Sequence, residues 1–186
     1  MRTLISLAHI SLDGFMAGPH GDMSFITYDA ELADHTYPLM ASVDTAVYGR
    51  TTYQMMESYW PGELEASDPH TRSHAHWYRD VAKIVASRTL TAAPTNVHVV
   101  AEDIVGVLRA EKAKPGGDLM IFASPTLTHA LTSADLVDEW RLTIHPVIMG
   151  GGLPLFAPGT PRTKLGLRST RSFRSGVIAA HYGTKR

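Results

Sequence analysis

Five short apolar runs separated by stretches of helical spacing constrain the fold of this chain most. The runs are Leu4 to Ile10, Thr45 to Tyr48, Lys83 to Ser87, Val97 to Val100 and Leu119 to Phe122. Most are rich in β-branched residues, as buried central strands are. Apolar residues at helical spacing fall between or beyond them, at Leu32 to Met40, Thr52 to Tyr59, Ile104 to Leu108 and Leu127 to Ala134. Strands that alternate with helices predict right-handed crossovers and a mainly parallel sheet.

The pattern changes after Val137. Trp140, Leu142 and Ile144 alternate with polar residues, and two more alternating runs follow, Thr163 to Thr170 and Val177 to Tyr182. The Arg-Ser-Gly sequence at 174 to 176 is typical of a hairpin turn. We therefore predict an α/β sandwich of about eight strands and four helices with an antiparallel C-terminal edge. Residues 1–186 show no linker or repeat and are expected to form one domain.

Composition narrows the classes of function. The chain is 44% hydrophobic and 19% charged, which is ordinary for one compact domain. Lys and Arg number 17 against 18 Asp and Glu, so no broad field favours nucleic acid or a membrane surface as partner. With no cysteine, disulfides and thiolate chemistry are excluded, which suits a cytoplasmic protein. The N-terminal run is typical of a strand and not of a signal peptide.

Three strand ends carry polar residues suited to anions. In "FASPTL", Ser124 can cap a helix and Pro125 suits its first position, while the free amides of that turn could equally face a phosphate. In "VYGRTTYQ", Arg50 stands at the turn with the hydroxyls of Thr51 and Thr52. A third end, "IVASRTL", carries Ser87, Arg88 and Thr89. The carboxyl ends of parallel strands line a common crevice, so the three turns together indicate a phosphate site.

An ordered set of motifs resembles a known family. The set is "SLDGFMAG" from Ser11, "YGRTTYQMM" from Tyr48, "ASRTL" from Ala86, "LMIFASPTL" from Leu119 and "LVDEWRLTIHPVIMGGGLPLF" from Leu136. It spans nearly the whole chain. In this set the chain resembles the dihydrofolate reductase-like superfamily, and most closely the bacterial proteins related to the C-terminal reductase domain of the bifunctional riboflavin-biosynthesis deaminase/reductase.

The resemblance implies a three-layer fold, NADPH as cofactor, a small-molecule substrate and a homodimer. The implied cofactor-binding residues are Gly49, Arg50, Thr51, Thr52, Ser87, Arg88, Thr89, Ala123, Ser124, Pro125, Thr126, Gly150 and Gly151. Ala123 stands where the family usually has glycine, and its Cβ lies where the backbone should meet phosphate. The strand that begins at Glu139-Trp140 is a candidate contributor to the dimer interface.

The resemblance places Asp13 beside the cleft, where it is the leading candidate for a proton donor. Asp13 also belongs to an Asp-Gly turn, in which it can simply bond its own loop. Glu57 and Tyr53 are weaker candidates on the helix after the Gly-Arg turn. The aromatic residues Phe15, Phe25, Tyr28 and Trp60 could form walls for a flat ring, although aromatic residues near turns more often serve ordinary packing. Dihydrofolate reductases carry an acid in the first helix for the pterin ring, and Asp29, Glu31 and Asp34 lie in that region, but nothing around them matches the family motif closely.

Glycines and histidines offer further alternatives. Gly150, Gly151 and Gly152 can form a hinge or allow close approach at the mouth of the cleft, and no Lys follows at Walker spacing. His70, His74 and His76 could contribute to a zinc site but lack a complete ligand set, which favours a solvated surface loop. His9 and His145 lie within strands and are predicted to be satisfied sheet residues.

Three functions follow as hypotheses. The first is an NADPH-dependent reductase of a small heterocyclic or phosphoribosylamino-pyrimidine-like substrate, with Arg50 and Arg88 on the cofactor. The second is a non-catalytic nucleotide-binding or ligand-binding dimeric module of the same fold. The third is a metal-dependent hydrolase built on the His70 cluster, although we predict no metal site.

Overall fold

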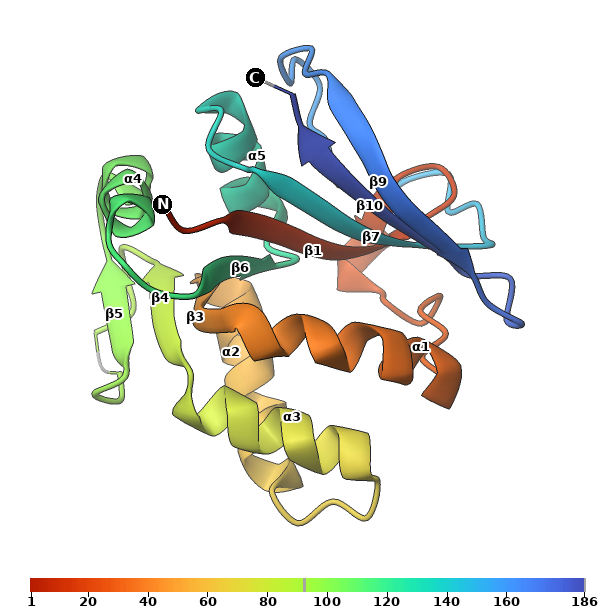
Figure 1. The fold of residues 1–186 in the computed structure, drawn as a ribbon, viewed down its shortest axis with the longest axis horizontal. Helices are drawn as coiled ribbons and strands as arrows, with labels where there is room; N and C mark the ends of the chain where they lie inside the picture. The colour runs from red at the N-terminus through yellow and green to blue at the C-terminus, as the bar shows by residue number, and fades with distance from the viewer. Residues whose placement is uncertain (92, 186) are drawn as a thin grey trace.

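An eight-stranded sheet forms the centre of the computed structural model, which describes residues 1–91 and 93–185. The strand order is β5-β4-β3-β6-β1-β7-β10-β9 (Figure 1). The bounds are β1 Leu4–Ser11, β3 Val43–Gly49, β4 Ala82–Ala86, β5 Val97–Val100, β6 Asp118–Phe122, β7 Glu139–His145, β9 Leu165–Ser172 and β10 Ile178–Thr184. All neighbours from β5 to β7 pair in parallel, whereas β10 pairs antiparallel with both β7 and β9. The predicted parallel sheet with an antiparallel C-terminal hairpin is confirmed.

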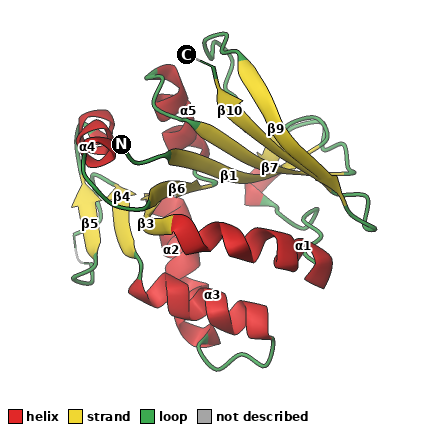
Figure 2. Cartoon of the chain, viewed as in Figure 1, coloured by secondary structure: helices red, strands yellow, loops and turns green. Residues whose placement is uncertain are grey.

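Helices cover both faces of this sheet and make the fold three-layered (Figures 1 and 2). Helices α4 (Ile104–Ala113) and α5 (Pro125–Ser133) lie on one face. Helices α1 (Ala30–Thr36), α2 (Arg50–Tyr59) and α3 (Pro69–Asp80) lie on the other, with short 3-10 segments at Pro19–Gly21, Tyr37–Ser42 and Trp60–Glu63. The even-numbered side chains of β1, such as Leu4 and Ala8, pack with Leu108 and Leu131, while Ile5 packs with Tyr53. The two faces thus bury separate apolar clusters, as a central parallel sheet requires.

A two-stranded ladder stands beyond the carboxyl end of β1. It pairs β2 (Phe15–Ala17) with β8 (Leu153–Pro154), and Leu155 N–H donates to the carbonyl of Gly14 at 2.9 Å. The approach is close at Gly152, which has φ 130°, because a Cβ there would lie 2.1 Å from the carbonyl oxygen of Ala17. Only glycine fits this position. The ladder was not predicted, since two or three residues are too few to show a period.

One prediction about the elements was wrong. Residues 70–76, predicted as a surface loop, belong to helix α3, whose N-cap is Asp68, and the carboxylate of Asp68 accepts from Thr71 N–H at 2.7 Å. The strand of Glu139 and Trp140, the candidate contributor to a dimer interface, lies inside the sheet, because β7 lies between β1 and β10 and Trp140 is only 2% exposed. The free edges in the described sheet are β5 and β9. The homodimer itself remains a prediction. None of the described helices is long and apolar enough to cross a membrane.

Candidate functional site

A cleft of about 480 Å³ runs along the carboxyl ends of the parallel strands. Its lining includes Ala86 from the end of β4, Gly49 from β3 and Ala123 after β6. Met16 and Leu153 reach it from the β2–β8 ladder. Because β4, β3, β6 and β1 are successive in the sheet, the cleft crosses from the α4 side to the ladder. This position and size are those of a small-molecule site in an open α/β fold.

Two helix N-termini that lack side-chain caps open into this cleft. Helix α2 begins after Gly49 and helix α5 after Ser124, and neither residue caps its helix through a side chain. The other three α-helices described have Asp29, Asp68 and Asp103 as their N-caps. Each of these carboxylates accepts a hydrogen bond from an amide in the first turn of its own helix. First-turn amides that no side chain satisfies are donors for an anion, and the helix dipole favours one there.

Ser124 joins the two N-termini. Its hydroxyl accepts from Gly49 N–H at 3.0 Å and donates to the carbonyl of Phe122 at 3.0 Å. The predicted capping role of Ser124 is therefore wrong: it holds the N-cap position, but its hydroxyl ties the end of β3 to the end of β6. Pro125 is the first residue of α5, as predicted, and Thr126 lines the cleft.

The turn before α5 keeps a glycine-like conformation without glycine. Ala123 has φ 46° and Ser124 has φ 54°, so two successive residues lie in the left-handed region. For residues with a Cβ this costs roughly 1–3 kcal/mol each. Surrounding bonds hold the turn, because Ala123 N–H donates to the carbonyl of Leu7 at 3.0 Å and Thr128 Oγ1 donates to the carbonyl of Ala123 at 2.8 Å. Ala123 thus retains the backbone that glycine would adopt there.

The other two predicted turns meet beside the cleft. Arg50 lines the cleft, and its Nη1 donates to the hydroxyl of Thr89 at 2.6 Å. Ser87 Oγ accepts from the amides of Thr89 and Leu90 at 3.2 and 3.0 Å and so shapes the turn after β4. Ser87 and Arg88 line a smaller hollow of about 210 Å³ that shares Ala86 with the main cleft. The structure therefore brings the predicted residues 49–52, 87–89 and 123–126 together.

Asp13 is bound to its own loops. One carboxylate oxygen accepts from Ser11 Oγ at 2.6 Å and from Met149 N–H at 3.0 Å, and the other accepts from Gly150 N–H at 2.8 Å. These bonds, led by that of Ser11, lower the pKa of Asp13 to about 2. A carboxylate that is ionised at neutral pH has no proton to donate, so the geometry favours the loop-bonding interpretation of Asp13.

Glu57 and Tyr53 face away from the cleft. Tyr78 donates its hydroxyl to Glu57 Oε2 at 2.7 Å, which ties α2 to α3. Burial and then Glu57 raise the pKa of Tyr53, which is 4% exposed in the cluster beneath the sheet. Neither residue is among those that line the cleft in the described part of the chain. Their placement indicates packing between two helices.

Gly150 and Gly151 lie in the loop between β7 and β8. Neither lines the cleft, but Leu153 at the start of β8 does. Gly150 has φ 72°, a conformation that suits glycine, and its amide bonds to Asp13. The loop thus connects β7 to the ladder and brings Leu153 to the apolar end of the cleft.

His9 and His145 lie side by side at the carboxyl ends of β1 and β7. His9 Nδ1 and His145 Nε2 are 3.3 Å apart, Thr143 Oγ1 lies 2.5 Å from His9 Nδ1, and Thr27 N–H donates to His145 Nδ1 at 3.2 Å. Burial, and to a lesser degree His145, lowers the pKa of His9 to about 4. Both imidazoles have protein partners, as predicted for satisfied sheet residues.

The remaining candidates have structural partners. His70 pairs with Asp34 at 2.8 Å, and His74 packs in tilted contact with the rings of Trp60 and Trp77. No group of three metal-ligating side chains occurs in the described residues. The aromatic residues Phe15, Phe25, Tyr28 and Trp60 are not among the lining residues of the cleft. Asp29 caps α1, and Glu31 contacts Arg171.

Sequence reasoning missed the apolar end of the cleft. Met16, Ala17, Met23 and Leu153 line it. Met16 and Ala17 fall inside the motif that follows β1, but nothing in the residue types distinguishes them from ordinary core. Their place depends on the β2–β8 pairing, which joins residues far apart in the sequence.

The layers, strand order and cleft define a dihydrofolate reductase-like fold. Dihydrofolate reductase from Enterococcus faecalis, complexed with NADP(H), aligns with a TM-score of 0.62 and 13% identity over 99% of this chain and 97% of that chain. The chain belongs to the RibD C-terminal domain family, whose model matches residues 2–179. The resemblance in the sequence motifs is thus confirmed.

Two other comparisons agree with this family. The uncharacterized protein YyaP of Bacillus subtilis (strain 168) is 31% identical over 183 residues, covering 97% of this chain and 94% of the relative. A putative riboflavin biosynthesis protein from Shewanella sp. PV-4 has a TM-score of 0.76 and 23% identity, covering 99% of both chains. These comparisons agree with the family and the fold and leave activity, cofactor and substrate to be argued from the site.

Proposed function

We propose that the protein is an NADPH-dependent reductase that transfers hydride to a small heterocyclic or phosphoribosylamino-pyrimidine-like substrate. The observation that carries this proposal is the pair of uncapped helix N-termini, α2 and α5, which open into one cleft. Two such termini supply backbone donors to two linked phosphates. Arg50 adds a cation at the same place, while no carboxylate lines the cleft in the described residues.

The lining of the cleft also changes along its length in the way that a dinucleotide requires. Near β4 and α4, Arg88 and Ser87 provide donors suited to a phosphate on an adenosine ribose, in a hollow that Glu102 and Asp103 also line. At the centre, the amides after Gly49 and Ser124 face the pyrophosphate position. At the other end, Met16, Met23 and Leu153 form an apolar surface for a flat ring. Residues from every one of the three predicted turns therefore have a place in this site.

Reduction also needs a proton for the heteroatom of the substrate. The bound nicotinamide would supply the hydride, and the chain would orient it and exclude water. No carboxyl, imidazole or ammonium side chain lines the cleft in the described part of the chain. We therefore assign proton delivery to water and not to Asp13 or Glu57.

The absence of an acid in the lining also favours a second candidate function. A dimeric module of the same fold could bind the nucleotide without reducing anything. The two functions differ in turnover: NADPH bound by a reductase is oxidised when substrate is added, whereas a binding module leaves it reduced across pterins, pyrimidine nucleotides and carbonyl compounds.

Titration of the purified protein with NADPH and NADH tests the proposal. Saturable NADPH binding is expected. Arg50→Ala should weaken both nucleotides, and Arg88→Ala should weaken NADPH more than NADH, because only NADPH carries the additional phosphate. Arg174→Ala is a matched control, since Arg174 is 93% exposed and lines neither hollow. Absence of saturable binding, or equal affinity in all three variants, would overturn the proposal.

A further inference from the structure

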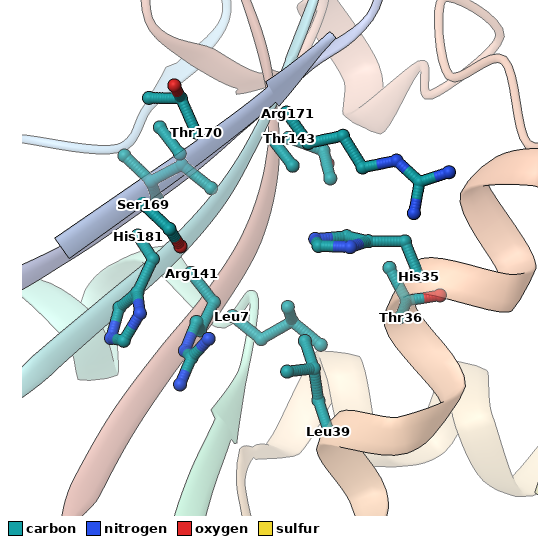
Figure 3. A pocket seen from close by; sticks show the side chains of 13 residues that line it. Leu7, His35, Thr36, Leu39, Arg141, Thr143, Ser169, Thr170, Arg171 and His181 are labelled. Atoms are coloured by element: carbon teal, nitrogen blue, oxygen red, sulfur yellow. The ribbon is translucent and has the colours of Figure 1, made fainter. Parts of the chain in front are cut away.

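A second cavity lies on the α1 face of the sheet. It has a volume of about 150 Å³ and lies between α1 and the strands β1, β7, β10 and β9. Figure 3 shows the His35 ring reaching from α1 toward the strands, Arg171 reaching from β9 toward the helix, and Arg141 beside His181 on the sheet. This cavity shares no lining residue with the cleft of the proposed reductase. Any ligand here is therefore independent of that function.

The charged side chains that line this cavity are basic. Arg141 and Arg171 line it with the histidines His35 and His181 and the hydroxyl residues Ser169 and Thr170, among apolar neighbours, and no carboxylate is among its lining residues in the described part of the chain. The hydroxyl of Thr36, which also lines it, already donates to the carbonyl of Leu32. The Nε–H of Arg141 is buried and has no hydrogen-bond partner. A buried donor without an acceptor is costly, and a guanidinium presents it in a fixed geometry that suits an oxyanion.

The neighbouring carboxylates do not neutralise these cations. Glu139 is shared by three basic groups: His181 at 2.9 Å, Arg168 at 3.0 Å and Arg141 at 3.3 Å. In the same way Glu31 is shared by two arginines, Arg174 at 3.5 Å and Arg171 at 3.6 Å. Four arginines thus contact two carboxylates, and the two that line the cavity, Arg141 and Arg171, share their carboxylates with the two that do not.

We propose that this cavity binds a phosphate group, either as inorganic phosphate or as the head of a small phosphate monoester. Guanidinium groups and hydroxyls are the donors that phosphate oxygens prefer. At about 150 Å³ the cavity is smaller than the sites of drug-sized ligands and suits a small anion. A whole nucleotide is too large for it.

The two histidines agree with an anion site. Burial, followed by the charges of Arg171 and Arg141, lowers the pKa of His35. Burial and Arg141 likewise lower the pKa of His181, against the opposing effect of Glu139. A bound dianion would reverse the arginine contribution, so the pKa of each histidine should rise when the site fills.

The test uses calorimetric titration of the full chain, saturated with NADPH, with inorganic phosphate and with glycerol 3-phosphate. At least one of the two compounds is expected to bind saturably. Tighter binding of inorganic phosphate identifies the free ion as the ligand, and tighter binding of glycerol 3-phosphate identifies a phosphate monoester. Arg171→Gln should weaken it about tenfold or more, the loss expected for one charge-assisted hydrogen bond. Arg174→Gln is the matched control, because Arg174 also contacts Glu31 but does not line the cavity. Its affinity should stay within about twofold of the unmodified protein.

Histidine NMR signals locate the binding. The pKa values of His35 and His181, assigned with His35→Gln and His181→Gln, should rise on addition of the ligand. In Arg171→Gln this rise should need correspondingly more ligand. Absence of saturable binding, equal losses in the two arginine variants, or binding that leaves both histidines unchanged would overturn the proposal. None of these outcomes depends on reductase turnover.

Discussion

Placing a carboxylate at the start of α2 should stabilise the fold and weaken dinucleotide binding at the same time. Gly49 is the N-cap of α2, with φ −79° and ψ 160°, which any residue adopts. A Cβ there would meet only Ser124, at 3.7 Å, which is ordinary contact. Gly49→Asp therefore fits the backbone. Its carboxylate would accept the first-turn amides that we assign to phosphate.

The two effects have opposite signs and different sizes. The cap, the dipole and the lower entropy of the unfolded chain each contribute a few tenths of a kcal/mol or more, or about 1 kcal/mol together. A carboxylate about 5 Å from a phosphate, at an effective dielectric of about 20, repels it by about 3 kcal/mol per unit charge. That is on the order of a 100-fold loss of affinity.

Gly49→Asn separates charge from blockage. Asn caps the helix nearly as well as Asp and occupies the same amides but carries no charge. We expect NADPH affinity to fall from the unmodified protein to Asn and further to Asp, with the gap between Asp and Asn shrinking at high salt. Urea unfolding measures the gain in stability. If both variants are more stable yet bind NADPH as tightly as the unmodified protein, the first turn of α2 does not contact phosphate.

Two further predictions concern stability. Ser124→Ala removes the hydroxyl of a residue that is 4% exposed and leaves the half-buried Gly49 N–H without its acceptor, so the free energy of unfolding in urea should fall by about 1 kcal/mol; an unchanged midpoint would contradict the bridging role. Burial holds the pKa of His74, like that of His9, at about 4 against 6.5 in the unfolded chain. The unfolded chain therefore binds the proton first, so the fold is most stable above pH 6.5 and loses stability as pH falls toward 4, by on the order of 3 kcal/mol per histidine; His74→Phe should flatten this decline.

The sequence predicts this fold well where elements are long and periodic. The buried strands and their polar carboxyl ends are visible as apolar runs followed by Gly-Arg, Ser-Arg and Ala-Ser-Pro turns, and parallel pairing then brings those turns together. Helix α3 is missed because most of its residues are polar and only Ala75 and Tyr78 are fully buried. The signal for its start, Asp68 followed by Pro69, is present but is also common in loops.

Contacts between residues distant in sequence account for the rest. The bond from Arg50 to Thr89 and the bridge from Ser124 to Gly49 require the register of β3 against its neighbours, which no local pattern specifies. The basic cavity beneath α1 is a similar case, because its arginines come from two strands of an alternating region in which exposed polar residues are unremarkable. Only the pairing of β7 with β10, and of β10 with β9, collects them on one face.

The conformation of Ala123 distinguishes two roles that a glycine could have at this turn, which the sequence alone does not distinguish. Glycine at this turn could be needed for a left-handed backbone or for close approach of a phosphate. Ala123 and Ser124 adopt the left-handed backbone regardless, and the bond from Ala123 N–H to Leu7 holds it there. Strain of this kind persists where the surroundings determine the geometry, and it keeps the start of α5 directed at the cleft. What remains for glycine to provide is space alone, so any effect of Ala123→Gly on NADPH affinity measures the crowding of one methyl group and not a change in the path of the chain.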